Sequence, residues 1–184
     1  PTAGGMSEGE GRKSTTASRS GCTPFFLKAD PHKTGTNSIL QVKRRIACFN
    51  TSGSMGYKST GVSKLDYAAT LAASLTYLML NQSDAVGLAT FSNEILSYVP
   101  PRIKPSHLNV VIEVLKHVKA EGKSDLGNVL NAIAEKVKMR SLIIVISDFF
   151  DDIMRIIKAL KHLHFHKNEI ILFHLLDPYE LEFP

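Results

Sequence analysis

The sequence has no tryptophan, few cysteines and no long apolar run, and each shortage removes a class of protein. Its two cysteines, Cys22 and Cys48, allow one disulfide bridge at most, which excludes a disulfide-stapled scaffold. No apolar run reaches the roughly 18 residues that cross a bilayer, so we expect no membrane span. No apolar N-terminal stretch ends in a small-residue cleavage site, so we expect a cytoplasmic protein.

Basic residues outnumber acidic residues, but the excess lies entirely near the N-terminus. The totals are 22 Lys+Arg against 17 Asp+Glu, a formal net charge of +5. Residues 1–45 hold 8 basic and 3 acidic side chains, which leaves 14 of each sign for residues 46–184. Because the larger part of the chain is neutral and the N-terminal charges are scattered, we expect no nucleic-acid partner.

The composition has enough apolar residues for one domain. Of 184 residues, 43% are hydrophobic, which can build a core without metal or disulfide support. Residues 1–45 are rich in Gly, Ser, Thr and Lys, with apolar clustering only at 25–27. We expect a flexible or divergent N-terminal segment over 1–45 and a folded domain over 46–184.

Apolar spacing predicts the elements of that domain. Short runs that are apolar throughout predict buried strands at 46–49, 85–91, 142–146 and 169–176. Apolar residues at helical spacing predict helices at 64–82, 108–118, 126–137 and 153–163. A short edge strand is expected at 95–99, ended by Pro100 and Pro101. Buried strands alternating with amphipathic helices predict a three-layer α/β fold with a mostly parallel sheet.

Polar residues follow two of these strands at the edge where open α/β sheets bind ligands. A Ser/Gly-rich loop follows the first strand, and a run with three aspartates follows 142–146. A third loop, 121–125, places Ser124 at an expected helix N-cap. Hydroxyls two residues apart in the first loop, a hydroxyl in the third and a carboxylate after the strand suit Mg²⁺ or Ca²⁺ better than Zn²⁺. The candidate metal ligands from this chemistry are Ser52, Ser54, Ser124 and Asp148.

The order Asn-x-Ser-x-Ser, then Ser124, then Asp148 resembles the metal-ion-dependent adhesion site (MIDAS) of von Willebrand factor A (vWA) domains, usually written Asp-x-Ser-x-Ser, Thr, Asp. Longer stretches resemble one bacterial branch, domain-of-unknown-function family 58. They include TSGSMGY at 51–57, GVSKLDYA at 61–68, SLIIVISDFFDD at 141–152 and FHLLDPYELEFP at 173–184. This resemblance covers about residues 46–184 and implies a Rossmann-like vWA fold.

Three departures from the family pattern bear on the metal. The resemblance adds Asn50 to the implied metal ligands, at the position where the family has its first carboxylate. Ser124 replaces the family's threonine but keeps a hydroxyl. At an effective dielectric of about 20, a unit charge pair ~4 Å apart is worth roughly 4 kcal/mol. We therefore expect the Mg²⁺ or Ca²⁺ affinity implied by the resemblance to be weakened or lost. The absence of tryptophan also means that the Asp-Trp segment upstream in the family has no counterpart here.

The resemblance implies a non-catalytic protein-binding module that engages its partner through the MIDAS-like rim. On the positions that flank the motif, we expect Met55, Gly56, Asp125 and Phe149 to contact that partner. Family members commonly accompany MoxR-type AAA ATPases, so an ATPase of that class is the expected partner. This inference is associational, because a fold does not determine a function.

Two other interpretations stay open at this point. One is a divalent-metal hydrolase that uses Asp148, Asp151 and Asp152 as a carboxylate cluster. The other is a metal-free scaffold in which Asn50 forms hydrogen bonds where an ion would sit. The loop at 52–56 lacks the glycine that precedes the serine of a nucleophile elbow, and no Gly-Lys-Ser/Thr phosphate loop occurs.

Overall fold

The computed structural model describes residues 23–27, 44–59 and 61–182, and Cys22 lies outside them. Six strands form a single sheet in the order β1-β6-β5-β2-β3-β4. Strands β2, β3, β5 and β6 run parallel to one another, and β1 and β4 pair antiparallel at the two edges. The strands are β1 (Thr23–Leu27), β2 (Arg44–Asn50), β3 (Ala85–Phe91), β4 (Ile95–Arg102), β5 (Leu142–Ser147) and β6 (Glu169–Leu176).

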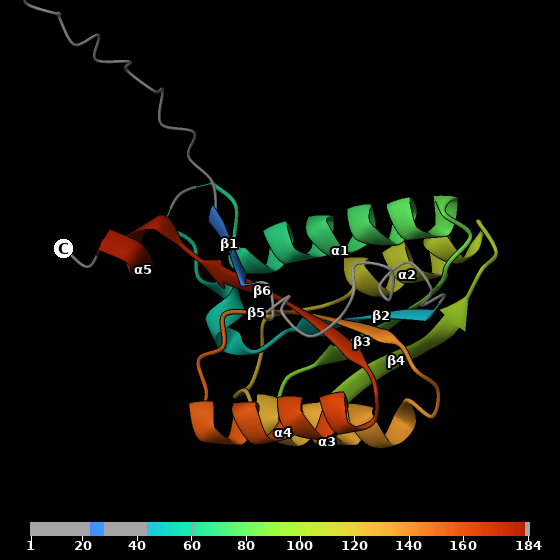
Figure 1. The fold of residues 1–184 in the computed structure, drawn as a ribbon. Coiled ribbons are helices and arrows are strands. Elements are labelled where there is room, and N and C mark those ends of the chain that lie inside the picture. The colour runs from blue at the N-terminus through green and yellow to red at the C-terminus, as the bar shows by residue number, and fades with distance from the viewer. Residues whose placement is uncertain (1–22, 28–43, 60, 183–184) are drawn as a thin grey trace, which may run out of the picture.

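Helices cover both faces of the sheet (Figure 1). Helices α1 (Lys64–Asn81) and α2 (His107–Lys116) lie on one face. Helices α3 (Leu126–Lys136) and α4 (Ile153–Phe165) lie on the other. A short 3₁₀ helix (Gly53–Gly56) follows β2, and α5 (Pro178–Glu182) follows β6. The predicted three-layer α/β fold with a mostly parallel sheet is confirmed.

The core divides into two halves because successive side chains of a strand point to opposite faces. In β2, Ala47 and Phe49 pack in the half under α1 and α2. Ile46 and Cys48 pack in the half under α3 and α4. A strand that is buried on both faces has no polar position, which explains the unbroken apolar runs in the sequence.

Strand β4 extends further than expected. It continues to Arg102, through Pro100 and Pro101, instead of ending at residue 99. The pairing with β3 slips where the prolines lie, with Leu88 opposite Val99 and Val86 opposite Arg102. Prolines are tolerated at this place because β4 is an edge strand and the ladder is irregular there. Gly87 leaves the space, since a Cβ at this position would come within 3.0 Å of the Pro101 ring.

The N-terminal and C-terminal ends of the described chain also differ from the prediction. Strand β1 lies inside the segment expected to be flexible or divergent and pairs with β6. Strand β2 begins at Arg44, ahead of the predicted domain boundary at residue 46. Helix α5 was not predicted at all. Among the described residues, no helix is both long enough and apolar enough to cross a membrane.

Candidate functional site

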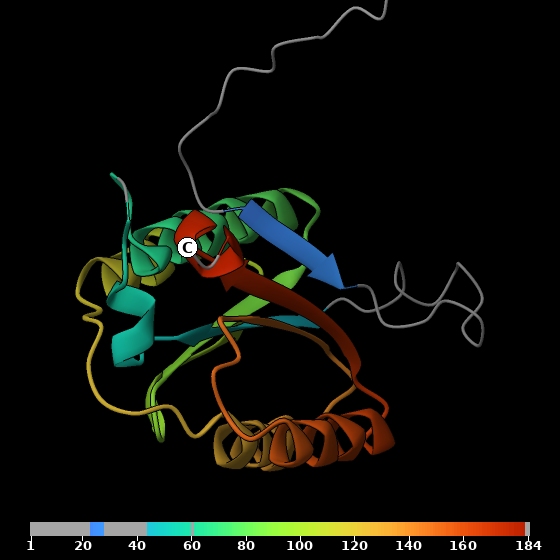
Figure 2. The ribbon, with the colours of Figure 1, turned by 90° about the vertical axis from the view of Figure 1, so that its left-hand side faces the viewer.

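The parallel strands end at one rim of the sheet (Figure 2). Three loops meet at this rim: the loop after β2, the loop before α3 and the loop between β5 and α4. The loop that follows β2 is joined to the loop that precedes α3 by two backbone hydrogen bonds. The Gly53 amide donates to the Gly122 carbonyl at 2.9 Å, and the Glu121 amide donates to the Thr51 carbonyl at 2.9 Å. A Cβ on Gly56 would lie 2.9 Å from that of Ala120, so glycine permits the close approach of the two loops.

Asn50 links the end of β2 to the end of β5. Its Nδ2 donates to the Ser147 hydroxyl at 2.9 Å and to Asp148 Oδ1 at 3.4 Å. Its Oδ1 accepts a hydrogen bond from the Ser52 amide at 2.9 Å. Asn50 and Asp148 are buried, at 0% and 1% exposure. The two segments are about a hundred residues apart in sequence, and they meet at the rim because parallel neighbouring strands end on the same side.

Not all of the predicted metal ligands belong to one hydrogen-bonded cluster. The hydroxyls of Ser52 and Ser54 lie 3.1 Å apart and share a hydrogen bond. Ser124 is half-buried in the loop before α3 and forms no hydrogen bond with another described residue. It is also not the N-cap of α3, because that position belongs to Asp125, whose carboxylate accepts from the Asn128 amide at 3.1 Å. Ser124 thus shares the rim without joining the hydrogen-bonded cluster.

A buried lysine completes the cluster, and sequence reasoning missed it. Lys64 is the first residue of α1 and is 0% exposed. Its ammonium lies 3.1 Å from Asp148 Oδ2 and 2.8 Å from Glu180 Oε1. A lysine beside the N-cap of an amphipathic helix is ordinarily solvated, so spacing alone gives no sign of this burial. The family-like stretches that contain Lys64 and Glu180 were the available signal, but neither residue was singled out in them.

The side chains as they stand do not fit a divalent ion. The side-chain amide of Asn50 donates a hydrogen bond to Asp148, and its Oδ1 already accepts one from the Ser52 amide. Asp148 accepts from Asn50 on one oxygen and from Lys64 on the other. A hard dication requires several free oxygen ligands, and here the carboxylate already has donors on both sides.

The proposed hydrolytic carboxylates serve three separate structural purposes. Asp148 pairs with Lys64, while Asp151 Oδ2 accepts from the Leu126 amide at 2.6 Å and joins the starts of α3 and α4. Asp152 is the N-cap of α4 and accepts from the Met154 amide at 2.8 Å. Within residues 44–59 and 61–182, no three His, Cys, Asp or Glu side chains form a metal-binding group.

The predicted partner-contacting residues differ in exposure. Met55 is 0% exposed and packs in the core, which corrects the prediction that it contacts a partner. Gly56 is exposed. Asp125 is half-buried and pairs with Arg155 at 3.0 Å. Phe149 is half-buried with its ring 5.4 Å from that of His174, and the neighbouring Phe150 is the exposed aromatic residue.

Helix α5 is held against the rim by Asp177. Its carboxylate accepts from the Ser59 amide and from the Tyr179 amide, both at 3.0 Å. Burial pushes the pKa of the Asp177 carboxyl upward, but hydrogen bonds from Ser59 and Tyr179 and the charge of Lys64 outweigh it. The pKa of Asp177 consequently lies below its usual range.

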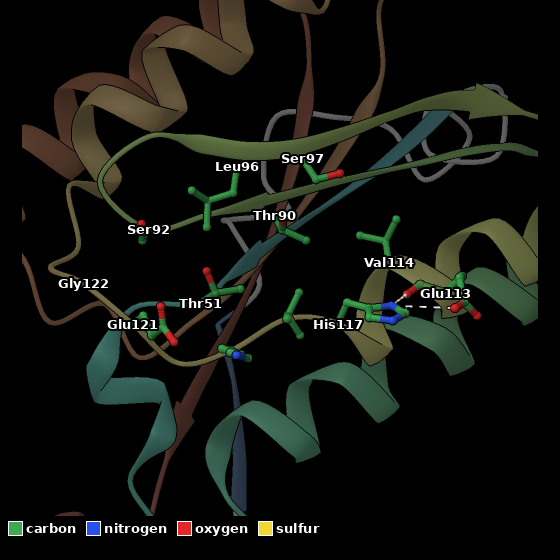
Figure 3. Close-up of a pocket in the computed structure, with 12 residues that line it drawn as sticks. Thr51, Thr90, Ser92, Leu96, Ser97, Glu113, Val114, His117, Glu121 and Gly122 are labelled. Atoms are coloured by element: carbon green, nitrogen blue, oxygen red, sulfur yellow. Dashed lines mark hydrogen bonds and ion pairs between the residues drawn. The ribbon is translucent and has the colours of Figure 1, made fainter.

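A pocket of about 770 Å³ opens beside the rim, between the end of α2 and strands β3 and β4 (Figure 3). Its wall includes Thr51, the residue between Asn50 and Ser52, together with Glu121 and Gly122 of the loop before α3. The pocket therefore shares two of its loops with the rim. On its α2 side, His117 Nδ1 lies 2.8 Å from the Glu113 carbonyl oxygen. Sequence reasoning did not predict this pocket, because its walls come from segments with no common motif.

Comparison with known proteins identifies the family of this chain. The family model described as "Protein of unknown function DUF58" matches residues 31–184. The chain belongs to the DUF58 family. This match begins ahead of the predicted boundary at residue 46, in agreement with the strand that starts at Arg44.

Relatives of this DUF58 chain are longer than the chain itself. Uncharacterized proteins from Mycobacterium tuberculosis and Mycobacterium bovis are 25% identical to it over 138 residues, covering 72% of this chain and 42% of each relative. The chain thus spans less than half the length of these curated relatives.

Two solved structures resemble the fold. One is an aerotolerance-related membrane protein from Bacteroides fragilis, with a TM-score of 0.57 and 18% identity over 69% of this chain and 64% of that chain. The other is BatB from Bacteroides thetaiotaomicron, with a TM-score of 0.54 and 17% identity over 70% and 64% of the two chains. At such identity the likeness concerns the fold alone.

Proposed function

We propose that this DUF58 chain is a non-catalytic protein-binding module of the vWA type, which contacts its partner with the rim. The observation that carries the proposal is a pair of exposed aromatic residues above the buried cluster. Tyr57 is 46% exposed and Phe150 is 55% exposed. Their ring centroids lie 6.0 and 4.9 Å from the same Lys64 ammonium. Aromatic side chains of this kind are enriched at the energetic centres of protein interfaces.

The buried network under these rings supports the proposal. Hydrogen bonds from Asn50 join the end of β2 to the end of β5, and the Lys64 ion pair joins the start of α1 to the loop after β5. A surface held rigid before binding loses less conformational entropy when a partner arrives. The adjacent pocket offers a concave surface to a protruding side chain of the partner.

The partner class comes from the family resemblance. We propose a MoxR-type AAA ATPase, contacted without a bridging Mg²⁺ or Ca²⁺ because position 50 carries no charge. A cytoplasmic location is proposed from the sequence expectation alone. Cell fractionation tests the location, and recovery in the membrane fraction would contradict it.

The test measures binding of a purified MoxR-type AAA ATPase from the source organism to the immobilised chain by biolayer interferometry. Tyr57→Ala and Phe150→Ala are each expected to weaken binding by roughly tenfold or more, since truncation of an interface aromatic often costs 2 kcal/mol or above. EDTA is expected to leave the affinity unchanged.

Matched controls are available on the same molecule. Tyr77, on α1, is 54% exposed, and Phe165, the last residue of α4, is 82% exposed. Tyr77→Ala and Phe165→Ala remove equivalent side chains away from the rim cluster and are expected to keep full affinity. Equal losses in the rim and control variants would contradict a rim interface, and absence of binding by every variant and the wild type would contradict the partner class.

The hydrolase alternative has no comparable support, because its three aspartates are engaged in separate contacts. A screen of phosphoester substrates with Mg²⁺ or Mn²⁺ tests the non-catalytic assignment. Turnover that disappears in Asp148→Ala would replace the binding-module proposal with an enzymatic one.

A further inference from the structure

The buried ammonium of Lys64 occupies an arrangement of oxygens that would otherwise suit a metal ion. Asp148 Oδ2 lies 3.1 Å from Nζ, and the two carboxylate oxygens of Glu180 lie 2.8 and 3.1 Å away. Three oxygens from two carboxylates, one of them fully buried, are the hard ligands that Mg²⁺ and Ca²⁺ select. In this protein they surround a lysine.

Burial makes the charge balance of this cluster decisive. The side chains of Lys64 and Asp148 are both 0% exposed, and that of Glu180 is 18% exposed. An isolated buried carboxylate is strongly unfavourable, so Asp148 needs a positive partner. Asn50 supplies only an amide dipole at 3.4 Å, which leaves Lys64 as the cation within contact distance of Asp148 among the described residues.

We infer that the Lys64 ammonium is the resident cation of this rim and that the wild-type chain takes up no Mg²⁺ or Ca²⁺ there. The lysine joins three elements, since Lys64 begins α1, Asp148 follows β5 and Glu180 lies on α5. The inference concerns the site of the proposed function but does not depend on partner binding.

The first test uses the wild-type chain. Isothermal titration calorimetry with Mg²⁺ and with Ca²⁺ is expected to give no binding heat. The thermal midpoint is expected to be the same in EDTA as in millimolar Mg²⁺, because a ligand raises the midpoint only when it binds the folded state. A midpoint that rises with Mg²⁺ and ceases to rise in Ser54→Ala would overturn the inference.

The second test removes the resident cation. In Lys64→Ala the carboxylates of Asp148 and Glu180 line a polar space that a small cation can enter. The midpoint of this variant is expected to fall, and then to rise again with Mg²⁺, Ca²⁺ or methylammonium. Lys58→Ala is the control, because Lys58 is an exposed lysine of the same loop region and its loss should create no cation response. A folded Lys64→Ala protein whose midpoint ignores all three cations would contradict the inference.

A double variant covers the case in which Lys64→Ala does not fold. Lys64→Ala/Asp148→Asn removes one charge of each sign, so it is expected to fold and to show no cation response. If only the double variant folds, the unpaired Asp148 charge is what unfolds the single variant, as the inference requires. If neither folds, Lys64 acts through the packing of its stem and the inference is wrong. Because these readouts use no partner, their failure is distinct from loss of ATPase binding by Tyr57→Ala.

Discussion

At the scale of single residues, burial determines the protonation state and reactivity of Cys48. Cys48 is a free thiol, 0% exposed, between the sheet and the α3–α4 layer. Burial raises the pKa of the Cys48 thiol to about 12, because the thiolate would lose its hydration. The side chain therefore acts as a small apolar group of the core.

This burial predicts a loss of stability in alkali. Below the unfolded pKa of about 8.5, Cys48 keeps its proton in both states and folding is not penalised. Above that pH the unfolded chain releases the proton while the folded chain retains it, so stability falls as pH rises toward about 12. The slope is at most about 1.4 kcal/mol per pH unit. Urea unfolding between about pH 8 and about pH 10 measures it.

The comparison is made in a Cys22→Ala background, so that Cys48 is the one remaining thiol. Adding Cys48→Ala should flatten the alkaline slope relative to that background. Identical slopes with and without Cys48 would show that the thiol is not the group responsible. Folded protein should also resist iodoacetamide until urea opens the core.

At the scale of elements, hydrogen bonds and close contacts position the helices around the rim. Asp177 holds α5 through the Ser59 and Tyr179 amides. Asp151 joins α3 to α4 through the Leu126 amide, and Gly127 lets the two helices approach. Asp151 thus ties the loop before α4 to the start of α3, while Asp177 ties α5 to the segment between β2 and α1, and these segments border the rim.

Acid should release the Asp177 contact. The pKa of Asp177 is lowered in the folded chain, so its contribution is present above the unfolded pKa of about 3.9 and is lost as pH falls through the folded pKa. Thermal midpoints measured from about pH 5 down to about pH 3 should therefore fall less in Asp177→Asn than in the wild type. Glu135→Gln, an exposed change on α3, should keep the wild-type acid dependence. An unchanged profile in Asp177→Asn would contradict the assignment.

The α3–α4 contact should not tolerate a side chain at position 127. A Cβ on Gly127 would lie 3.0 Å from the Arg155 Cβ and 3.4 Å from its carbonyl carbon. Gly127→Val is expected to lower the free energy of unfolding by about 1–3 kcal/mol through overpacking, as measured in urea. Valine has a higher helix propensity than glycine, so a loss of stability in Gly127→Val cannot come from intrinsic propensity. A Gly127→Val protein as stable as the wild type would rule out the close contact.

At the scale of the whole molecule, one sheet separates two core halves and joins them. Phe49 packs toward α1 and α2, and Leu130 packs on the α3–α4 side. Strands β2 and β5 contribute residues to both halves, so neither half can form without the sheet that also supports the other. The rim lies at the end of this shared sheet, and its geometry depends on both halves.

Because the halves share their strands, we expect one cooperative transition. Phe49→Ala and Leu130→Ala should each lower the free energy of unfolding by about 2–5 kcal/mol. Both should shift a single midpoint that is the same by far-ultraviolet circular dichroism and by tyrosine fluorescence. Two separated transitions in either variant would contradict the shared-core description.

The amino-acid sequence by itself determined the order and type of most elements. Signals for a helix or a buried strand lie within a short window, as at 169–176, where prediction and structure coincide. The α/β class follows from that order. Turn residues also placed Asn50 and Asp148 correctly at the ends of strands.

Only the tertiary structure decided what the rim contains. Lys64 meets Glu180 across 116 residues, Met55 turns into the core, and Ser124 stays outside the hydrogen-bonded cluster. Likewise β1 is a strand because β6 supplies its hydrogen bonds. Each of these contacts joins residues far apart in the chain. It can stabilise the protein only after the sheet has brought those residues together. Local apolar periodicity does not indicate such long-range contacts. This is why the fold could be predicted from the sequence, while the pairing of Lys64 with Asp148 and Glu180 at the rim could not.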